Sequence, residues 1–311
     1  MKKISNIKYI LALLAVIVIA IACDKVEPTG VLIGHTSVND RVKQSIVYYR
    51  DWDKMAGEHE VKGDYSFLVG SDSHLRDDLT RLSEMFDDQI ANNDILSAHC
   101  GDLAETQPEY YALVEDLVEE YYNNYPGKFN FYPVVGNHDI TRNGWAMYTK
   151  IFSMSTYVVE VIVVDDNGKE VARDALIFLD SANGTFGDYQ LDVIDLSLFW
   201  DLDEETMDVI SKQDTYRHKF VFTHTNFFRP RKNAFSSTLP REELYHMFRL
   251  FHDWHVDIVF CGHIHAWDDR EYAGVRYITL DAMSADNNPE YGELVRCYVG
   301  DKVDCKTVRI K

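Results

Sequence analysis

Five short clusters of carboxylate, amide and imidazole side chains stand out in this sequence as groups that can bind metal ions. Taken singly they are weak signals, because an Asp after a Gly is ordinary turn chemistry and a lone His is usually structural. Taken together, these oxygen and nitrogen donors suit divalent Mn, Fe, Zn or Ni. The clusters are Ser71-Asp72-Ser73-His74, Gly101-Asp102-Leu103-Ala104-Glu105, Gly136-Asn137-His138-Asp139, Phe222-Thr223-His224-Thr225 and Cys261-Gly262-His263-Ile264-His265.

Each cluster follows a segment whose composition predicts a buried strand. Helical spacing of apolar residues separates several of these segments, as in 77–91, 108–122 and 241–254. Alternation of strands and helices predicts an α/β layered fold, in which sites assemble beyond the carboxyl ends of the strands. The predicted strands are 65–70, 94–98, 129–135, 219–223 and 257–261.

The remaining chain offers fewer signals. Segments 157–164 and 171–180 are rich in β-branched residues and predict a long hairpin with its turn at Asp166-Asn167-Gly168. A helix is expected near 203–213, and 270–310 is expected to hold two or three antiparallel strands. No internal repeat or flexible linker divides the body of the chain, so we expect one catalytic domain.

The five clusters, in this order, resemble the motifs of the calcineurin-like metallophosphoesterase family. Those motifs run Asp-x-His, Gly-Asp-x-x-Asp/Glu, Gly-Asn-His-Asp/Glu, a lone His, and Gly-His-x-His. The resemblance implies a sandwich of two mixed β-sheets flanked by helices, a four-layer αββα arrangement. It also implies two metal ions, with Asp102 bridging them. One ion would be held by Asp72, His74, Asp102 and His265, and the other by Asp102, Asn137, His224 and His263.

The same resemblance implies hydrolysis of a phosphate mono- or diester by a hydroxide that bridges the two ions. His138 would assist as an acid or as a donor to the transition state, and Asp139 could orient it through a hydrogen bond. Glu105 stands where many members carry Asp, at a position expected to be peripheral to the metal ions. The metal motifs contain no Tyr, which disfavours the purple acid phosphatase branch.

The first residues predict an export signal. Lysines precede an apolar run at 9–22, which is too short for a comfortable membrane span and suits a secretory segment. Its end, Ala20-Ile21-Ala22-Cys23, resembles a bacterial lipobox. We therefore expect a signal peptide at 1–22, a lipid anchor on Cys23 and a linker with an accessory element to 60, followed by the catalytic domain at 61–311. Plain secretion and a retained anchor stay open alternatives.

The composition of the chain limits the classes of partner that it can bind. The 311 residues are 46% hydrophobic and carry a formal net charge of −20. This acidity disfavours nucleic-acid polymers as partners. The expected partners are a small phosphorylated substrate and a membrane of the bacterial cell envelope, and the protein could face the periplasm or the cell surface. The oligomeric state stays open. A non-catalytic metal-binding lipoprotein is the main alternative, and a metallopeptidase lacks support because there is no HExxH motif.

Two further groups of residues have open roles. Arg229 and Arg231 could reach a substrate phosphate, although ordinary loop charges explain them equally well. Cys297 and Cys305 flank a predicted turn and could pair across its two strands, in the oxidising setting that export provides. Cys100 and Cys261 are expected to be small buried residues.

Overall fold

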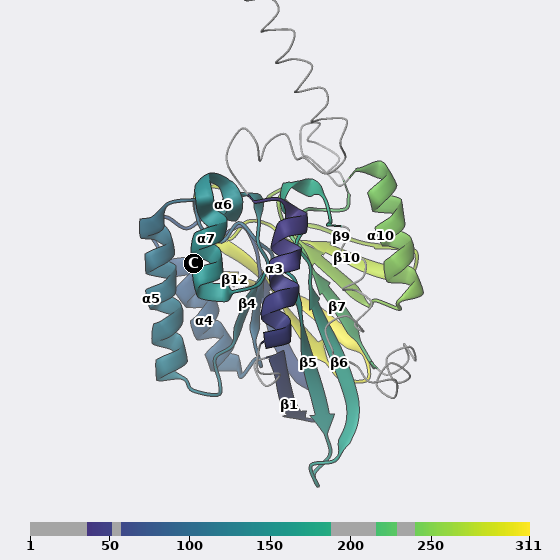
Figure 1. The fold of residues 1–311 in the computed structure, drawn as a ribbon. Helices are drawn as coiled ribbons and strands as arrows, with labels where there is room; N and C mark the ends of the chain where they lie inside the picture. The colour runs from purple at the N-terminus through teal and green to yellow at the C-terminus, as the bar shows by residue number, and fades with distance from the viewer. Residues whose placement is uncertain (1–35, 52–56, 188–215, 229–239) are drawn as a thin grey trace, which may run out of the picture.

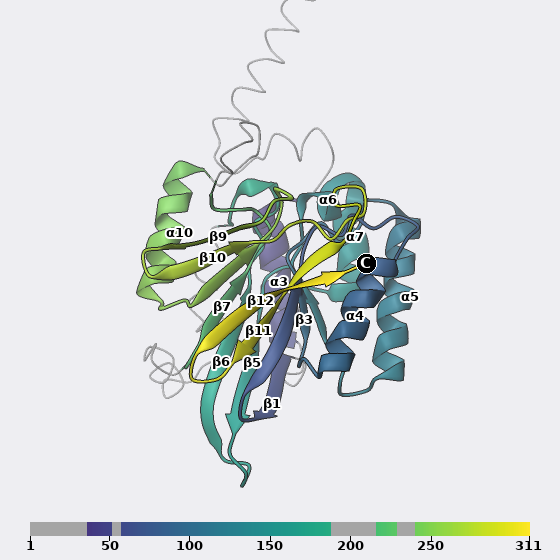
Figure 2. The same cartoon turned by 180° about the vertical axis from the view of Figure 1, so that it is seen from behind.

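The computed structural model describes residues 36–51, 57–187, 216–228 and 240–311, which form four layers (Figures 1 and 2). Two mixed β-sheets pack face to face, and helices cover the outer face of each sheet. The predicted four-layer α/β fold is therefore confirmed.

The larger sheet has seven strands in the order β1-β5-β6-β7-β8-β10-β9. β6, β7, β8 and β10 run parallel, whereas the β5–β6 and β10–β9 pairs are antiparallel. The strands are β1 Glu58–Lys62, β5 Tyr157–Val164, β6 Glu170–Phe178, β7 Lys219–Phe222, β8 Ile258–Cys261, β9 Asp268–Tyr272 and β10 Val275–Thr279.

The smaller sheet has five strands in the order β12-β11-β2-β3-β4. β2, β3 and β4 are parallel, so their carboxyl ends lie at one edge, and β11 and β12 add antiparallel strands beside β2. The strands are β2 Tyr65–Gly70, β3 Ser97–His99, β4 Phe131–Pro133, β11 Gly292–Val299 and β12 Val303–Ile310.

Helices pack on both outer faces. α3 and α10 bury apolar side chains against the seven-stranded sheet, and α4, α5 and α7 do so against the five-stranded sheet. The helices are α3 Val38–Asp51, α4 Thr80–Asn92, α5 Pro108–Asn124, α6 Asn137–Ile140, α7 Gly144–Phe152 and α10 Arg241–Asp253, with short 3-10 turns η2 Thr141–Asn143 and η3 Ala182–Gly184.

Aromatic side chains fill the space between the two sheets. Phe67 of β2 meets Phe220 of β7 edge to face, with ring centroids 5.1 Å apart. Phe222 stacks on Phe178 of the neighbouring strand at 4.6 Å. All four rings are fully buried. These contacts fix one sheet against the other, and so fix the strand ends at which the metal-type residues lie.

Several elements differ from the sequence expectation. The turn after β4 leads into α6, η2 and α7, which the sequence did not predict, and the C-terminal region holds four strands rather than two or three. α3 and most of β1 fall in the expected accessory element, yet α3 packs on the larger sheet and β1 is its edge strand. The helix expected near 203–213 lies outside the described residues.

The structure forms the cysteine pair that the sequence left open. Cys297 and Cys305 face each other on β11 and β12 and form a disulfide, while Cys100 and Cys261 are free and buried. No helix among the described residues is long and apolar enough to cross a membrane. The expected signal segment and Cys23 lie outside the described part of the chain.

Candidate metal centre

The loops after five strands converge at one edge of the sandwich. Backbone hydrogen bonds join the loop after β2 to the loop after β3, from Asp72 N–H to Gly101 (3.0 Å) and from His74 N–H to Asp102 (3.0 Å). The loop after β8 joins the loop after β7 through a bond from Gly262 N–H to His224 (2.9 Å). Both sheets therefore contribute ligand-type side chains to a single place.

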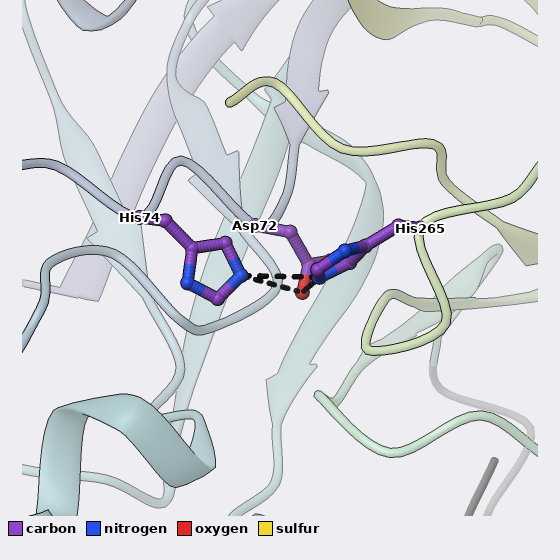
Figure 3. A group of neighbouring side chains, drawn as sticks. All are labelled: Asp72, His74 and His265. Atoms are coloured by element: carbon purple, nitrogen blue, oxygen red, sulfur yellow. Dashed lines mark hydrogen bonds and ion pairs between the residues drawn. The ribbon is translucent and has the colours of Figure 1, made fainter. Parts of the chain in front are cut away.

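The first group consists of Asp72, His74 and His265 (Figure 3). His265 Nε2 lies 3.2 Å from Asp72 Oδ1, and His74 Nε2 lies 3.9 Å from the same oxygen. The two imidazole Nε2 atoms are 3.0 Å apart. Asp72 is fully buried, whereas both rings are partly exposed. Three donor atoms from β2 and β8 loops thus face a common point.

The second group gathers around His224, which is fully buried. Its Nε2 lies 3.0 Å from Asn137 Oδ1, 3.3 Å from Asp102 Oδ2 and 3.2 Å from His263 Nδ1. The same Asp102 oxygen lies 3.8 Å from His74 Nε2 in the first group. The structure therefore brings all seven predicted ligands together and places Asp102 between the two groups.

Hydrogen bonds at the outer nitrogens orient two of the imidazoles. His74 Nδ1 faces Glu105 Oε1 at 3.3 Å, and His224 Nδ1 faces the Cys100 carbonyl at 2.8 Å. Both partners are acceptors, so each Nδ1 carries the hydrogen. Both Nε2 atoms then point inward toward carboxylate oxygens, so that either a proton or a metal ion can lie between nitrogen and oxygen.

The buried carboxylates of the centre favour positive charge on the groups around them. Burial alone would lower the pKa of His224, but attraction and a hydrogen bond from Asp102 outweigh burial and raise that pKa to about 10. Burial opposes ionisation of Asp102, yet the surrounding imidazoles lower the pKa of its carboxyl group. The residues present thus fit a metal site: two buried carboxylates facing convergent imidazole nitrogens.

His138 lies at the mouth of the centre and its partner is Glu105. His138 Nδ1 is 3.1 Å from Glu105 Oε2, and its ring stands edge-on to that of His74 at 4.6 Å. The ring is 41% exposed. Burial lowers the pKa of His138, but the charges of Asp102 and Glu105 outweigh burial and raise that pKa. Glu105, expected from the sequence to be peripheral, therefore contacts both rings.

The expectation that Asp139 orients His138 is wrong. The buried carboxylate of Asp139 makes no hydrogen bond to the His138 ring; it ties the loop after β3 to the turn after β4. Burial and the charge of Asp102 raise the pKa of Asp139 to about 6. Its donors are Gly136 N–H (2.7 Å), Leu103 N–H (3.0 Å), Ala104 N–H (3.2 Å) and the Tyr111 hydroxyl (2.6 Å).

The backbone at the centre is unusual. Left-handed φ values, which non-glycine residues rarely adopt, occur at five of the seven expected ligands. The close approach of the loops also requires glycine, since a Cβ on Gly136 would lie 2.1 Å from Asp102 N and one on Gly262 would lie 1.9 Å from Ser71 Oγ. The φ angles are 53° at Asp72, 45° at His74, 53° at Asp102, 73° at His263 and 48° at His265.

Residues that follow β6 support the loops around the centre. Ser181 Oγ accepts hydrogen bonds from the backbone N–H of His224 (3.2 Å) and of Thr225 (2.9 Å), so it supports the loop after β7. Asp180 forms a buried ion pair with Arg41 of α3. Arg229 and Arg231 lie outside the described residues.

Comparisons with known proteins give a family and similar folds. A family model described as calcineurin-like phosphoesterase matches residues 65–267. A dimetal phosphatase from Danio rerio has a similar structure, with 12% identity and a TM-score of 0.53 over 79% of this chain and 96% of that chain. A purple acid phosphatase from yellow lupin seeds (Lupinus luteus) also has a similar structure, with 12% identity and a TM-score of 0.53 over 80% of this chain and 52% of that chain. No curated protein matches.

Proposed function

The chain belongs to the calcineurin-like phosphoesterase family and is a metallophosphoesterase, and on that premise we propose that it hydrolyses a small phosphate ester with two divalent metal ions. Asp72, His74 and His265 would hold one ion. Asn137, His224 and His263 would hold the other, and Asp102 would bridge them. The donor set is compatible with Mn, Fe, Zn or Ni.

The observation that carries this proposal is the position of Asp102. One of its carboxylate oxygens faces an imidazole nitrogen from each group, His74 at 3.8 Å and His224 at 3.3 Å. Its other oxygen accepts the backbone N–H of His138 at 2.7 Å. A single buried carboxylate therefore joins both groups of ligands and fixes the turn that carries His138.

His138 and Glu105 have separate roles beside the metal-type residues. Bound divalent cations at such a site lower the pKa of water and neutralise phosphoryl charge. His138 is partly exposed beside the centre, so its Nε2 can donate a proton toward the leaving oxygen or a hydrogen bond to a phosphoryl oxygen. Glu105 accepts at His138 Nδ1, which stabilises the protonated ring and fixes its direction.

An activity assay tests the proposal. Purified protein, stripped with a chelator and reloaded with Mn²⁺, would be tested on nitrophenyl phosphate and bis(nitrophenyl) phosphate. We expect metal-dependent turnover of at least one of them, and the ratio of the two rates assigns monoester or diester preference. Stoichiometric metal binding without turnover of either ester would instead favour the non-catalytic lipoprotein.

We further propose that the protein is an exported bacterial lipoprotein anchored through Cys23. The support is the sequence alone: a basic start, an apolar run and Ala-Ile-Ala-Cys at its end. Expression with a labelled fatty acid in a bacterial host should label the wild-type chain and place it in the membrane fraction. Cys23→Ser should abolish the label, and equal labelling of both chains would rule out this anchor.

A further inference from the structure

A pocket of about 430 Å³ opens beside His138. Its volume lies in the range typical of small-molecule sites. Asn137 is the only one of the seven expected ligands that lines it, and His138 lines it as well. A phosphate ester whose phosphoryl group lies at the centre would therefore place the rest of the molecule in this pocket.

The charged side chains that line the pocket differ in their pairing. Arg76 is 3.2 Å from Asp286 and 4.0 Å from Glu105, so its charge is balanced. Each Glu105 oxygen already faces an imidazole, that of His74 or that of His138. Arg142 also lines the pocket, yet it makes no ion pair or hydrogen bond with any described residue. Its guanidinium is the unbalanced charge.

The backbone that carries Arg142 is tightly held. Arg142 has φ 48° and ψ 42°, a left-handed conformation that is uncommon for a side chain of its size. Thr141 before it is hydrogen-bonded to Thr106 at 2.7 Å, and Thr106 also donates to the His138 carbonyl. After it, Gly144 packs so closely on Asp139 that a Cβ would lie 2.1 Å from the Asp139 carbonyl oxygen.

An exposed arginine is common, but this one combines three features: it lines a pocket that contains His138, it lacks a carboxylate partner among described residues, and its backbone is held in a strained turn. In a chain with a net charge of −20, an unbalanced cation at a pocket wall selects for an anion. A guanidinium binds carboxylate and phosphate through paired hydrogen bonds.

We propose that Arg142 binds a second anionic group, a carboxylate or a phosphate, on the part of the substrate that is not the reacting phosphoryl group. The favoured substrates are therefore small phosphate esters with an anionic leaving part. This inference rests on the proposed hydrolase function. Arg142 acts as a specificity residue, because it contacts the remainder of the ester and not the reacting phosphorus.

Matched substrates test the inference. Phenyl phosphate would be compared with its para-carboxymethyl, para-phosphonomethyl and para-aminomethyl analogues, using the Mn²⁺-loaded full chain. We expect kcat/KM to be about tenfold higher for an anionic analogue than for the plain ester, chiefly through KM, and lowest for the cationic analogue. The carboxymethyl and phosphonomethyl arms distinguish a carboxylate from a phosphate as the preferred second group.

Substitutions assign the preference to one residue. In Arg142→Ala the ratio of kcat/KM for the anionic and plain esters should fall to about one, and Arg142→Glu should favour the aminomethyl ester. Arg249→Ala is the matched control, because Arg249 is an exposed arginine on α10, and it should keep the wild-type ratio. A thermal melt of each variant verifies folding.

Three results distinguish a failure of the role of Arg142 from a failure of the hydrolase proposal. A wild-type enzyme that hydrolyses plain and anionic esters equally well would overturn the role of Arg142 and leave the hydrolase proposal standing. An anionic preference that survives both Arg142 substitutions would also overturn it. No turnover of any of the four esters, with metal bound, would contradict the hydrolase proposal itself.

Discussion

Glu105 shows how one side chain links the metal-type residues to the proposed acid. Its two oxygens accept from the Nδ1 atoms of His74 and His138, so it holds a predicted ligand and a proton donor in fixed relative positions. Glu105 is only partly exposed, at 27%, which strengthens both contacts relative to bulk water.

Glu105→Gln therefore has a specific expected effect. The amide keeps the shape but no longer stabilises a protonated His138, so kcat should fall about 10–100-fold. The loss should be larger for phenyl phosphate than for nitrophenyl phosphate, whose leaving group needs less protonation. Steady-state kinetics with both esters measure the fall in kcat and its dependence on the leaving group.

A second variant shows whether Glu105 acts through His138. His138→Ala should lose about 10²–10⁴-fold in turnover with its metal content unchanged. The Glu105→Gln/His138→Ala double variant should be no slower than His138→Ala alone, because His138 is then absent and the glutamine oxygen can still accept from His74. Multiplicative losses would assign Glu105 a separate role.

The ligand-type residues that the sequence singled out lie close together, and they could be found because each motif is local. Asp72 and His74, or His263 and His265, are two residues apart, and the strand before each pair sets its direction. The partner of His138 is 33 residues away, in the loop after β3, and no local pattern reveals it. Asp139 was misassigned for the same reason: its donors come from two loops and α5.

At the scale of elements, His218 joins the two sheets. It precedes β7, and its Nδ1 donates to Asp257 (3.2 Å) while its Nε2 donates to the Gly300 carbonyl (2.9 Å) between β11 and β12. Both nitrogens face acceptors, so the protonated ring is favoured. The hydrogen bond to Asp257 raises the pKa of His218, although burial opposes the rise.

This contact predicts a pH dependence of stability. The folded pKa of His218 lies above the unfolded value of about 6.5, so its stabilisation is fully present below that pH and is lost as pH rises through the folded pKa. His218→Gln should therefore lower the free energy of unfolding more at pH 6 than at pH 9. Urea unfolding at both values measures the difference, and equal losses would refute the protonated contact.

Helix α3 is attached to the larger sheet by a buried ion pair. Arg41 Nε and Nη2 donate to Asp180 at 2.7 and 3.0 Å, and both side chains are fully buried. Arg41→Met leaves a buried carboxylate without its cation, which should cost about 3–5 kcal/mol of unfolding free energy. Chemical denaturation tests this, with Arg249→Ala, expected within about 0.5 kcal/mol of wild type, as the surface control.

The strands with continuous apolar runs were predictable, because a strand buried on both faces needs apolar residues at nearly every position. The helices after β4 were not: residues 136–144 contain Gly136, Asn143 and Gly144, which are turn signals, and α6 is only four residues long. β1 was missed because its exposed, charged sequence Glu-His-Glu-Val-Lys lies at a sheet edge, where pairing rather than composition decides.

At the scale of the whole molecule, the sandwich is what makes the centre possible. β2 and β3 of one sheet and β7 and β8 of the other end at the same edge, so ligand-type residues as far apart in the sequence as Asp72 and His265 meet. Edge-to-face contacts of Phe67 with Phe220, Phe222 and Phe260 join the two sheets and hold these ends together. The family resemblance predicted this arrangement, whereas composition and spacing alone reached only an α/β fold.

Metal stoichiometry tests the central claim most directly. Elemental analysis of Mn²⁺-loaded wild-type protein should give two ions per chain. Asp102→Asn should lower that content sharply, because the bridging carboxylate serves both positions, and Asp304→Asn, an exposed acid on β12, should not. Wild-type protein without bound metal, or an Asp102→Asn variant that keeps both ions, would contradict a two-metal centre built around Asp102.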